Sequence, residues 1–153
     1  MDKNNTASVL IDLSAAIVSV RGDQPVCLTV PDVSEYQTPG LPFGPFYPDQ
    51  HRTMEIGLRQ WVIEQTSLDI GYVEQLYTFG DRGRRSEGAD NKTENEHIVS
   101  VGYLALSKQC PQPNQWSEWY KHFPWEDWRE GRPNILNQKI IPYLEAWAGS
   151  DEL

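Results

Sequence analysis

The sequence is poor in several features that point directly to a function. Cysteine is scarce, and the two thiols, Cys27 and Cys110, lie too far apart for a disulfide framework or a zinc-ligand motif. No apolar run approaches the roughly 18 residues that a membrane-spanning helix needs, and the first residues lack the apolar stretch of a signal peptide. We therefore expect a cytoplasmic protein with reduced cysteines and no membrane partner.

Positive charge is also scarce. The chain has 22 acidic and 13 basic residues, and its formal charge of -9 has the wrong sign for a domain that binds nucleic acid by neutralising phosphates. The three histidines, His51, His97 and His122, are scattered and suggest neither a zinc site nor a Ser/His/Asp arrangement. Any contact with DNA would need a local surface or a segment outside this chain.

Large apolar side chains are plentiful. The 153 residues include six Trp, seven Tyr and four Phe, which is enough for one packed core. Two apolar runs, Ala7–Val20 and Pro25–Val30, flank a Gly-Asp pair and predict a β-hairpin. The following stretch, residues 31–48, holds five prolines and two glycines, so it predicts a long loop without regular structure.

The rest of the chain predicts one helix, two strands and a helical end. Apolar residues recur at helical spacing over Thr53–Gln65, where Thr53 can cap the helix. Tyr72–Phe79 and Ile98–Leu106 have strand composition, and the second has apolar residues on both faces, as in a central strand. Between them, residues 84–96 form a polar loop. The last third is rich in Trp, and Pro142 predicts a kink or two short helices within Asn134–Trp147.

Part of this pattern resembles the Nudix box. The stretch from Leu41 to Leu68 has its loop-helix-loop shape, in which the family carries the motif Arg-Glu-apolar-x-Glu-Glu-x-Gly-apolar. The glutamates of that box hold Mg²⁺ against a diphosphate, because a hard cation prefers carboxylate oxygens. The resemblance therefore implies the Nudix fold, with nucleotide derivatives as ligands.

The chemistry of the box matches poorly. Aligned on its end, the chain has Gln60 at the arginine, Trp61 at the adjacent glutamate, and Glu64 with Gln65 at the final acidic pair. Arg52 stands at the early glutamate, and Ser67 at the glycine. One carboxylate of three survives, so we expect no catalytic residues, with Glu64 as the residual metal candidate.

A narrower resemblance covers residues 41–106. The segments Gly71–Arg82 and Val99–Leu106 are similar to Nudix-related bacterial transcriptional regulators of NAD metabolism. The Leu-Pro-Phe-Gly-Pro-Phe stretch, Trp61 and Phe123–Arg129 look most like the alphaproteobacterial type. These regulators join a Nudix-like sensor, which recognises ADP-ribose or a related nucleotide, to a winged-helix domain, for which residues 111–153 leave no room.

The resemblance and the pattern together define the expected architecture. We predict an α+β fold, a Nudix-like mixed-sheet α/β/α sandwich with a Trp-rich helical C-terminal end. The single domain would comprise a core sheet and box helix in residues 1–110 and a helical extension in residues 111–153. A winged-helix DNA-binding domain would lie in a missing C-terminal part, and the sensor would be a homodimer, which suits a palindromic operator.

Candidate ligand contacts come from the loop and from the strand after the helix. They are Tyr36, Phe43, Gly44, Tyr77, Phe79 and Arg82. Aromatic rings would stack on a base, Gly44 would let the backbone approach a phosphate, and Arg82 would bind phosphate as a bidentate donor. Core packing is the alternative for each aromatic residue, and a turn for Gly44. Arg84 and Arg85 fit a solvated loop.

Three functions remain open on these grounds. The first is a non-catalytic sensor of an NAD-related nucleotide such as ADP-ribose or NAD, in a regulator of NAD metabolism. The second is a divergent Mg²⁺-dependent Nudix hydrolase of nucleoside diphosphate derivatives, with Glu64 assisted by acids such as Glu74 or Asp81. The third is an interaction module that uses the aromatics of the loop. The Trp cluster at residues 116–128 fits a stacking platform or, better, packing of a helical end onto the sheet.

Overall fold

The computed structural model describes residues 8–31, 39–81, 96–108, 110 and 115–150. Its elements are β1 (Ser8–Arg21), β2 (Gln24–Leu28), β3 (Phe43–Pro45), α1 (Met54–Thr66), β4 (Val73–Phe79), β5 (Glu96–Leu106), β6 (Trp116–Glu118), α2 (Trp119–His122), the 3-10 turn η2 (Pro124–Glu126), the π-helical turn η3 (Leu136–Ile140) and α3 (Ile141–Ala148). None of the helices in these ranges is long and apolar enough to cross a membrane. Along the chain, three strands precede α1 and three follow it before the helical end, which agrees with the predicted α+β class.

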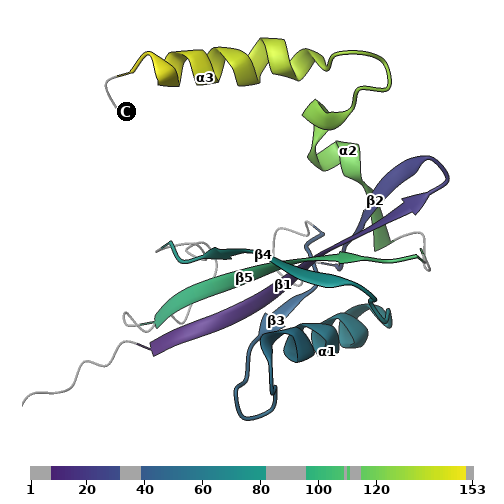
Figure 1. Ribbon diagram of the computed structural model, residues 1–153, viewed down its shortest axis with the longest axis vertical. Coiled ribbons are helices and arrows are strands. Elements are labelled where there is room, and N and C mark those ends of the chain that lie inside the picture. The colour runs from purple at the N-terminus through teal and green to yellow at the C-terminus, as the bar shows by residue number, and fades with distance from the viewer. Residues whose placement is uncertain (1–7, 32–38, 82–95, 109, 111–114, 151–153) are drawn as a thin grey trace, which may run out of the picture.

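The strands form one mixed sheet. Its order is β4-β5-β1-β2-β6, and β3 pairs with β1 outside this path (Figure 1). β1 and β5 run parallel, whereas the other pairs are antiparallel. β5 lies between β4 and β1, which confirms that it is a central strand.

The N-terminal hairpin is formed as the sequence predicts. β1 and β2 pair from Val18 with Cys27 to Arg21 with Gln24, which leaves Gly22 and Asp23 as the turn. Gly22 has a φ of +67°, a left-handed conformation that glycine adopts without steric cost. The Gly-Asp pair therefore sets the register of the hairpin.

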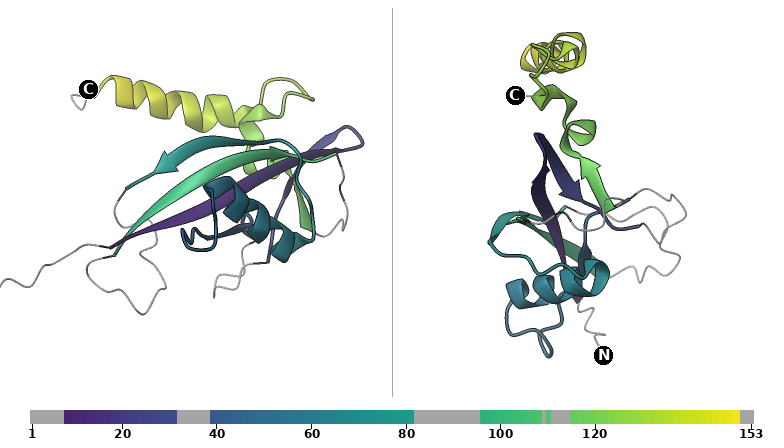
Figure 2. Two further views of the ribbon diagram at one scale, coloured as in Figure 1. Left: turned by 60° about the horizontal axis from the view of Figure 1, so that its bottom comes forward. Right: turned by 90° about the vertical axis from the view of Figure 1, so that its right-hand side faces the viewer.

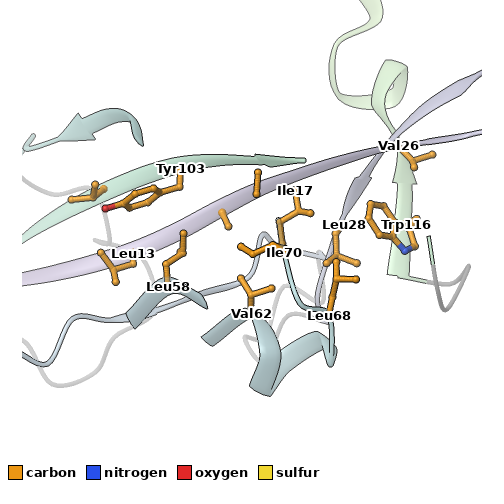
Figure 3. Packing of buried hydrophobic residues seen from close by; sticks show 13 residues of the cluster. Leu13, Ile17, Val26, Leu28, Leu58, Val62, Leu68, Ile70, Tyr103 and Trp116 are labelled. Atoms are coloured by element: carbon orange, nitrogen blue, oxygen red, sulfur yellow. The ribbon is translucent and has the colours of Figure 1, made fainter. Parts of the chain in front are cut away.

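The core lies between α1 and one face of the sheet. Leu13 and Ile17 point from β1 toward Leu58 and Val62 of the helix (Figure 3). Ala15 lies between them on the same side of β1, and all five residues are fully buried. Their spacing is two residues on the strand and four on the helix, which matches the geometry of each element. This apolar contact fixes α1 on the sheet.

The ends of α1 also follow from its sequence. Thr53 is the N-cap residue and accepts a hydrogen bond from the backbone N–H of Ile56, as predicted. At the other end, Ser67 has a φ of +56° and donates its backbone N–H to the carbonyl of Ile63. A left-handed residue at this position is the usual stop of a helix and is most often glycine.

The Pro-rich loop contains a strand that the sequence analysis did not predict. β3 pairs with β1 from Asp12 with Pro45 to Ser14 with Phe43. Proline lacks a backbone N–H, but it is tolerated in a strand that pairs on one side only. The expectation of a loop without regular structure was therefore wrong at this point.

The Trp-rich end departs from the expected helical structure at its start. Trp116 belongs to the strand β6, pairs with Leu28 and is buried in the core. After β6, α2 packs against β2, so this short part of the helical end does contact the sheet, as expected. Trp119, Phe123 and Trp125 form their own aromatic cluster, with ring centroids 4.4 and 5.6 Å apart.

The final helix behaves differently. Pro142 does not divide this part of the chain into two helices: the chain is helical without a break over residues 134–148, and the π-helical turn η3 directly precedes α3. Neither η3 nor α3 has a buried residue, and α3 packs closely only against η3 among the described elements. It lies on the side of the sheet away from α1 and apart from it (Figure 2). The packing on the sheet that was expected for the Trp cluster at residues 116–128 therefore does not extend to α3.

The two free cysteines should differ in reactivity. Burial raises the pKa of the Cys27 thiol to about 11, whereas Cys110 is only half-buried. Near neutral pH, on the order of one Cys27 side chain in ten thousand would then be the reactive thiolate. We expect a thiol reagent to label the native protein once, at Cys110, and twice after unfolding, as read by intact mass. A native Cys110→Ser variant that still takes up label would contradict this.

Candidate functional site

Four strands bring the predicted aromatic residues together on one face of the sheet. Phe43 of β3 pairs with Ser14 of β1, Ser14 with Gly102 of β5, and Gly102 with Tyr77 of β4. Residues that pair across a sheet point to the same side. Phe43 and Tyr77 therefore stand at the two ends of a row whose middle is formed by Ser14 and Gly102.

A second row runs beside the first. Pro45 pairs with Asp12, Asp12 with Ser100, and Ser100 with Phe79. The rings of Phe79 and Tyr77 meet edge to face with centroids 4.8 Å apart. A Cβ on Gly102 would lie 3.5 Å from the Phe79 ring, so this ring leans over the glycine.

These two rows, which we call the open face, lie on the side of the sheet opposite α1. The neighbours of Ser14, Leu13 and Ala15, point into the core, so Ser14 points away from it. Tyr77 is 64% exposed and Phe43 40% exposed. At roughly 4.8 Å per strand, the backbones of the two residues lie ~14 Å apart, with Ser14 and Gly102 between them. A planar ring could lie on this face between aromatic flanks.

Gly44 faces the other way. It is buried, pairs with Leu13, and an added Cβ would lie 2.3 Å from the Trp61 ring. Trp61 of α1 donates its indole N–H to the carbonyl of Pro45 at 2.9 Å, which holds the ring against β3. The missing side chain of Gly44 thus makes room for Trp61, and its contact with a ligand stays a prediction.

Gln65 makes a second link from α1 to β3. Its amide N–H donates to the carbonyl of Phe43 at 2.6 Å, and its amide oxygen accepts from the Phe43 backbone N–H at 3.1 Å. Both hydrogen-bonding groups of Phe43 are therefore bound by one side chain. Phe43 owes its place on the open face partly to this pair of bonds, which we call the Gln65 clamp.

The acidic residues of α1 are engaged in local pairs. Glu55 binds Arg59 at 2.8 Å, and Glu64 accepts a hydrogen bond from Gln60 at 2.8 Å. Arg59 also donates to the carbonyls of Ile70 and Gly71, so it ties the helix to the segment before β4.

The other acids that could assist Glu64 lie on or after β4. Glu74 accepts a hydrogen bond from the Tyr72 hydroxyl at 2.7 Å, which raises the pKa of Tyr72, and Asp81 is exposed. Within the described ranges, no three His, Cys, Asp or Glu side chains come close enough together to hold a metal ion. Among the described residues, Glu64 therefore belongs to no such cluster.

Other predicted contacts lie outside the described residues. These are Tyr36, which follows β2 in the chain, and Arg82, which follows β4; Arg84 and Arg85, which were expected in a solvated loop, also lie outside the described residues. Of the four predicted contacts that are described, Phe43, Tyr77 and Phe79 lie on the open face, whereas Gly44 faces α1.

Some residues at the site were missed by sequence reasoning. His51 is 1% exposed, accepts the backbone N–H of Tyr47 at Nδ1 and contacts the rings of Phe46 and Trp61. Its ring lies where a Cβ on Gly57 would be, so it packs against the start of α1. This packing role of His51 depends on residues that surround it only in the folded chain, so no local pattern in the sequence signals it. For Ser14 and Gly102, small residues alternating with apolar ones in two strands were the available signal.

Solved structures with the same arrangement identify the fold. The Nudix domain of Shewanella oneidensis NrtR, a cocrystal structure with ADP ribose, matches 77% of this chain and 75% of its own, with a TM-score of 0.58 and 22% identity. A MutT/nudix family protein from Enterococcus faecalis matches 72% of this chain and 41% of its own, with a TM-score of 0.58 and 19% identity. The chain has the Nudix fold.

The Nudix fold leaves the function to be argued from the side chains. Shewanella oneidensis NrtR complexed with a 27mer DNA matches 63% of this chain with a TM-score of 0.51 and 24% identity, and the match covers 41% of the NrtR chain. No model of a protein family and no curated protein matches the sequence. One fold can host many activities, so the residues of the site carry the functional argument.

Gly44→Ala tests the packing of Trp61 on β3. The new methyl group would overlap the Trp61 ring, and the bond to Pro45 opposes its displacement. We expect the free energy of unfolding to fall by about 2 kcal/mol in urea denaturation. Gly80→Ala is the control, because nothing lies within 4 Å of its Cβ position and its φ is not positive. Equal stabilities of both variants would show that the ring does not lie against Gly44.

Gln65→Ala tests the clamp on Phe43. The variant loses two hydrogen bonds to β3, so we expect the free energy of unfolding to fall by about 1 kcal/mol. Gln60→Ala removes an exposed amide on the same helix that bonds only Glu64, and it should change the value by less than about 0.5 kcal/mol. A larger loss for Gln60→Ala than for Gln65→Ala would argue against the clamp.

Proposed function

We propose that this chain is a ligand-sensing Nudix domain that binds an NAD-related nucleotide, such as ADP-ribose or NAD, without cleaving it. In a regulator of NAD metabolism, such a domain would change the behaviour of the whole protein when its ligand is bound. A switch of this kind needs a ligand that binds two states with different affinity, and it does not need turnover.

The observation that carries the proposal is the use of α1. The Nudix box would place glutamates at the positions of Trp61 and Gln65, and both side chains here bond the main chain of β3. Glu64 is the one box glutamate of three that remains, so Mg²⁺ would need ligands from outside the box. Trp61 and Gln65 thus hold β3 from two positions at which a catalytic Nudix box would have metal-binding glutamates.

The open face supports a nucleotide as the ligand. Tyr77 and Phe79 offer aromatic rings beside the flat floor at Gly102, and Phe43 stands at the far end of the row. Aromatic side chains stack on bases regardless of base identity. The Nudix domain of NrtR was solved with ADP ribose, which is a compound of this class. Arg82, which follows β4, would bind the phosphates.

The wider role extends beyond this chain. Shewanella oneidensis NrtR was solved with DNA, and the matched part is less than half of that chain. We propose that the sensor acts in the cytoplasm as a homodimer and that DNA is bound by a winged-helix domain encoded further along a longer protein. The charge of -9 supports a DNA contact outside this chain.

A Mg²⁺-dependent hydrolase of nucleoside diphosphate derivatives is the second candidate. The MutT/nudix family protein from Enterococcus faecalis resembles this chain as closely as the NrtR domain does by TM-score. Glu64 is exposed and could contribute one metal ligand. This candidate needs further carboxylates, which the described residues do not bring close to Glu64.

Binding without turnover is the decisive test. Thermal unfolding would be followed with ADP-ribose, NAD or ATP, each with and without Mg²⁺, while the same mixtures are assayed for cleavage. We expect ADP-ribose or NAD to raise the melting temperature, because a ligand that binds only the folded state stabilises it. Cleavage that depends on Mg²⁺ would establish the hydrolase instead, and no shift with any nucleotide would favour an interaction module.

Variants of Tyr77 then test the open face. Loss of one stacked ring typically costs about 1 to 3 kcal/mol, so Tyr77→Ala should weaken ADP-ribose binding about tenfold or more by calorimetry. Tyr77→Phe keeps the ring and should bind like the parent protein. Thr78→Ala is a second control, because Thr78 pairs with Val101 on the core side of the sheet. Equal affinity of all three variants would place the ligand elsewhere.

A further inference from the structure

The helix α3 exposes an unusual amount of apolar surface. Tyr143, Leu144 and Trp147 are 82%, 55% and 53% exposed, and Ile140 and Ile141 are only half-buried. A helix that is apolar on most sides is ordinarily covered by other elements. α3 therefore lacks a partner surface in this arrangement of the described elements.

One side of this helix forms a hollow. Its volume is about 590 Å³, and it is lined by Gln138, Lys139, Pro142, Tyr143, Ala146, Trp147 and Ser150. All of these residues belong to η3, α3 and the residue after Gly149, so no part of the sheet closes the hollow. Ala148 lies about 200° around the helix from Ala146 and points to the other side.

The open face is a matching surface on the same side of the molecule. Figures 1 and 2 show α3 on the side of the sheet away from α1, where the open face also lies. η3 and α3 together span about 20 Å at 1.5 Å per residue, which is longer than the ~14 Å from β3 to β4. One helix could therefore cover both rows of the open face.

The connection to α3 can turn without disturbing the sheet. Arg129 is anchored, because it binds both carboxylate oxygens of Asp127 at 2.7 and 2.8 Å and lies 4.6 Å from the centre of the Tyr120 ring. Two residues later, Gly131 is exposed, has a φ of +99°, and has open space around its Cβ position. The direction in which the chain leaves this segment is thus set at the Gly131 turn, whose backbone N–H donates to the Trp128 carbonyl at 3.1 Å.

We propose that α3 turns about Gly131 onto the open face of its own chain and closes over the ligand as a lid. The lid role rests on the proposed function, whereas closure of the helix can be tested without any ligand. The chain's own sheet is the favoured partner because a short tether gives an effective concentration in the millimolar range, well above that of a second copy in dilute solution. Closure covers the hollow side of α3 and the exposed rings of the open face together.

Cross-linking between β1 and α3 tests closure. The protein would carry Ala16→Cys and Ala146→Cys in a Cys110→Ser background, in which the buried Cys27 is unreactive. Ala16 lies on the open side of β1, two residues beyond the rows that would hold the ligand. A short bismaleimide links two thiols by addition, and gels with intact mass separate intrachain from interchain products.

We expect an intrachain product without ligand and at least a threefold faster reaction with ADP-ribose. The matched control pairs Ala16→Cys with Ala148→Cys, on the other side of α3, and should react more slowly.

Each other result has a separate meaning. A product that is mainly interchain and rises with protein concentration would assign α3 to a second copy, and no product from either pair would exclude closure. If calorimetry detects ADP-ribose binding but the intrachain rate does not change, α3 closes without acting as a lid. If ADP-ribose does not bind the parent protein, the proposed function fails, and the ligand-free reaction still decides whether the helix closes.

A dissociation measurement tests the lid without cysteines. Trp147→Ala removes an exposed ring from the hollow side of α3, so we expect ADP-ribose to dissociate about tenfold faster in stopped-flow displacement. Glu145→Ala changes an exposed polar residue on the same helix and should leave the rate unchanged. Equal dissociation rates for the two variants would overturn the lid.

Discussion

The register of β1 sets both functional sides of this sheet. The strand has 14 residues and pairs with β5 along one edge and with β3 and β2 along the other. Side chains alternate between faces, so a slip of one residue would exchange Leu13, Ala15 and Ile17 for Asp12, Ser14 and Ala16 against α1. The buried apolar core holds β1 in this register. Because Leu13 and Ala15 point into the core, Ser14 must point to the open face. Phe43 and Tyr77 share a row because both pair, directly or through β5, with this one strand.

The links between α1 and β3 show how a fold can keep its shape while its helix takes a new task. β3 has only three residues and contains a proline, so its own ladder with β1 supplies few hydrogen bonds. Trp61 and Gln65 add three bonds from the helix to the main chain of this strand. A glutamate at position 65 could accept from the Phe43 N–H, but as a carboxylate it could not donate to the Phe43 carbonyl. Positions 61 and 65 need hydrogen-bond donors to hold the carbonyls of β3 but would need carboxylates to bind a metal.

Charge divides the proposed ligand between two parts of the site. The described open face carries aromatic rings, small residues and the carboxylate of Asp12, none of which favours a phosphate. Two described arginines are committed elsewhere, Arg59 to Glu55 and two backbone carbonyls and Arg129 to Asp127. Under the proposed function, the rings of a nucleotide would lie on the open face and its phosphates would contact Arg82, which is outside the described residues. In a chain with a charge of -9, such local placement matters more than net charge.

The sequence by itself determined the elements whose signals are local. Alternation and the Gly-Asp turn predicted the hairpin, helical spacing with a cap predicted α1, and apolar faces on both sides predicted a central β5, all of which were found. The Nudix resemblance also pointed to the fold that the solved structures share. Only the tertiary structure decided that Gly44 lies beneath Trp61, that residues 43–45 form a strand, and that α3 stands away from the sheet. These outcomes depend on contacts between segments far apart in the chain, such as β3 with β1 and Gln65 with Phe43, and no local pattern records them. Gly44 and Phe43 also lie on opposite faces of the sheet. Side chains alternate along a strand, but which face each one takes is known only from the pairing of β3 with β1.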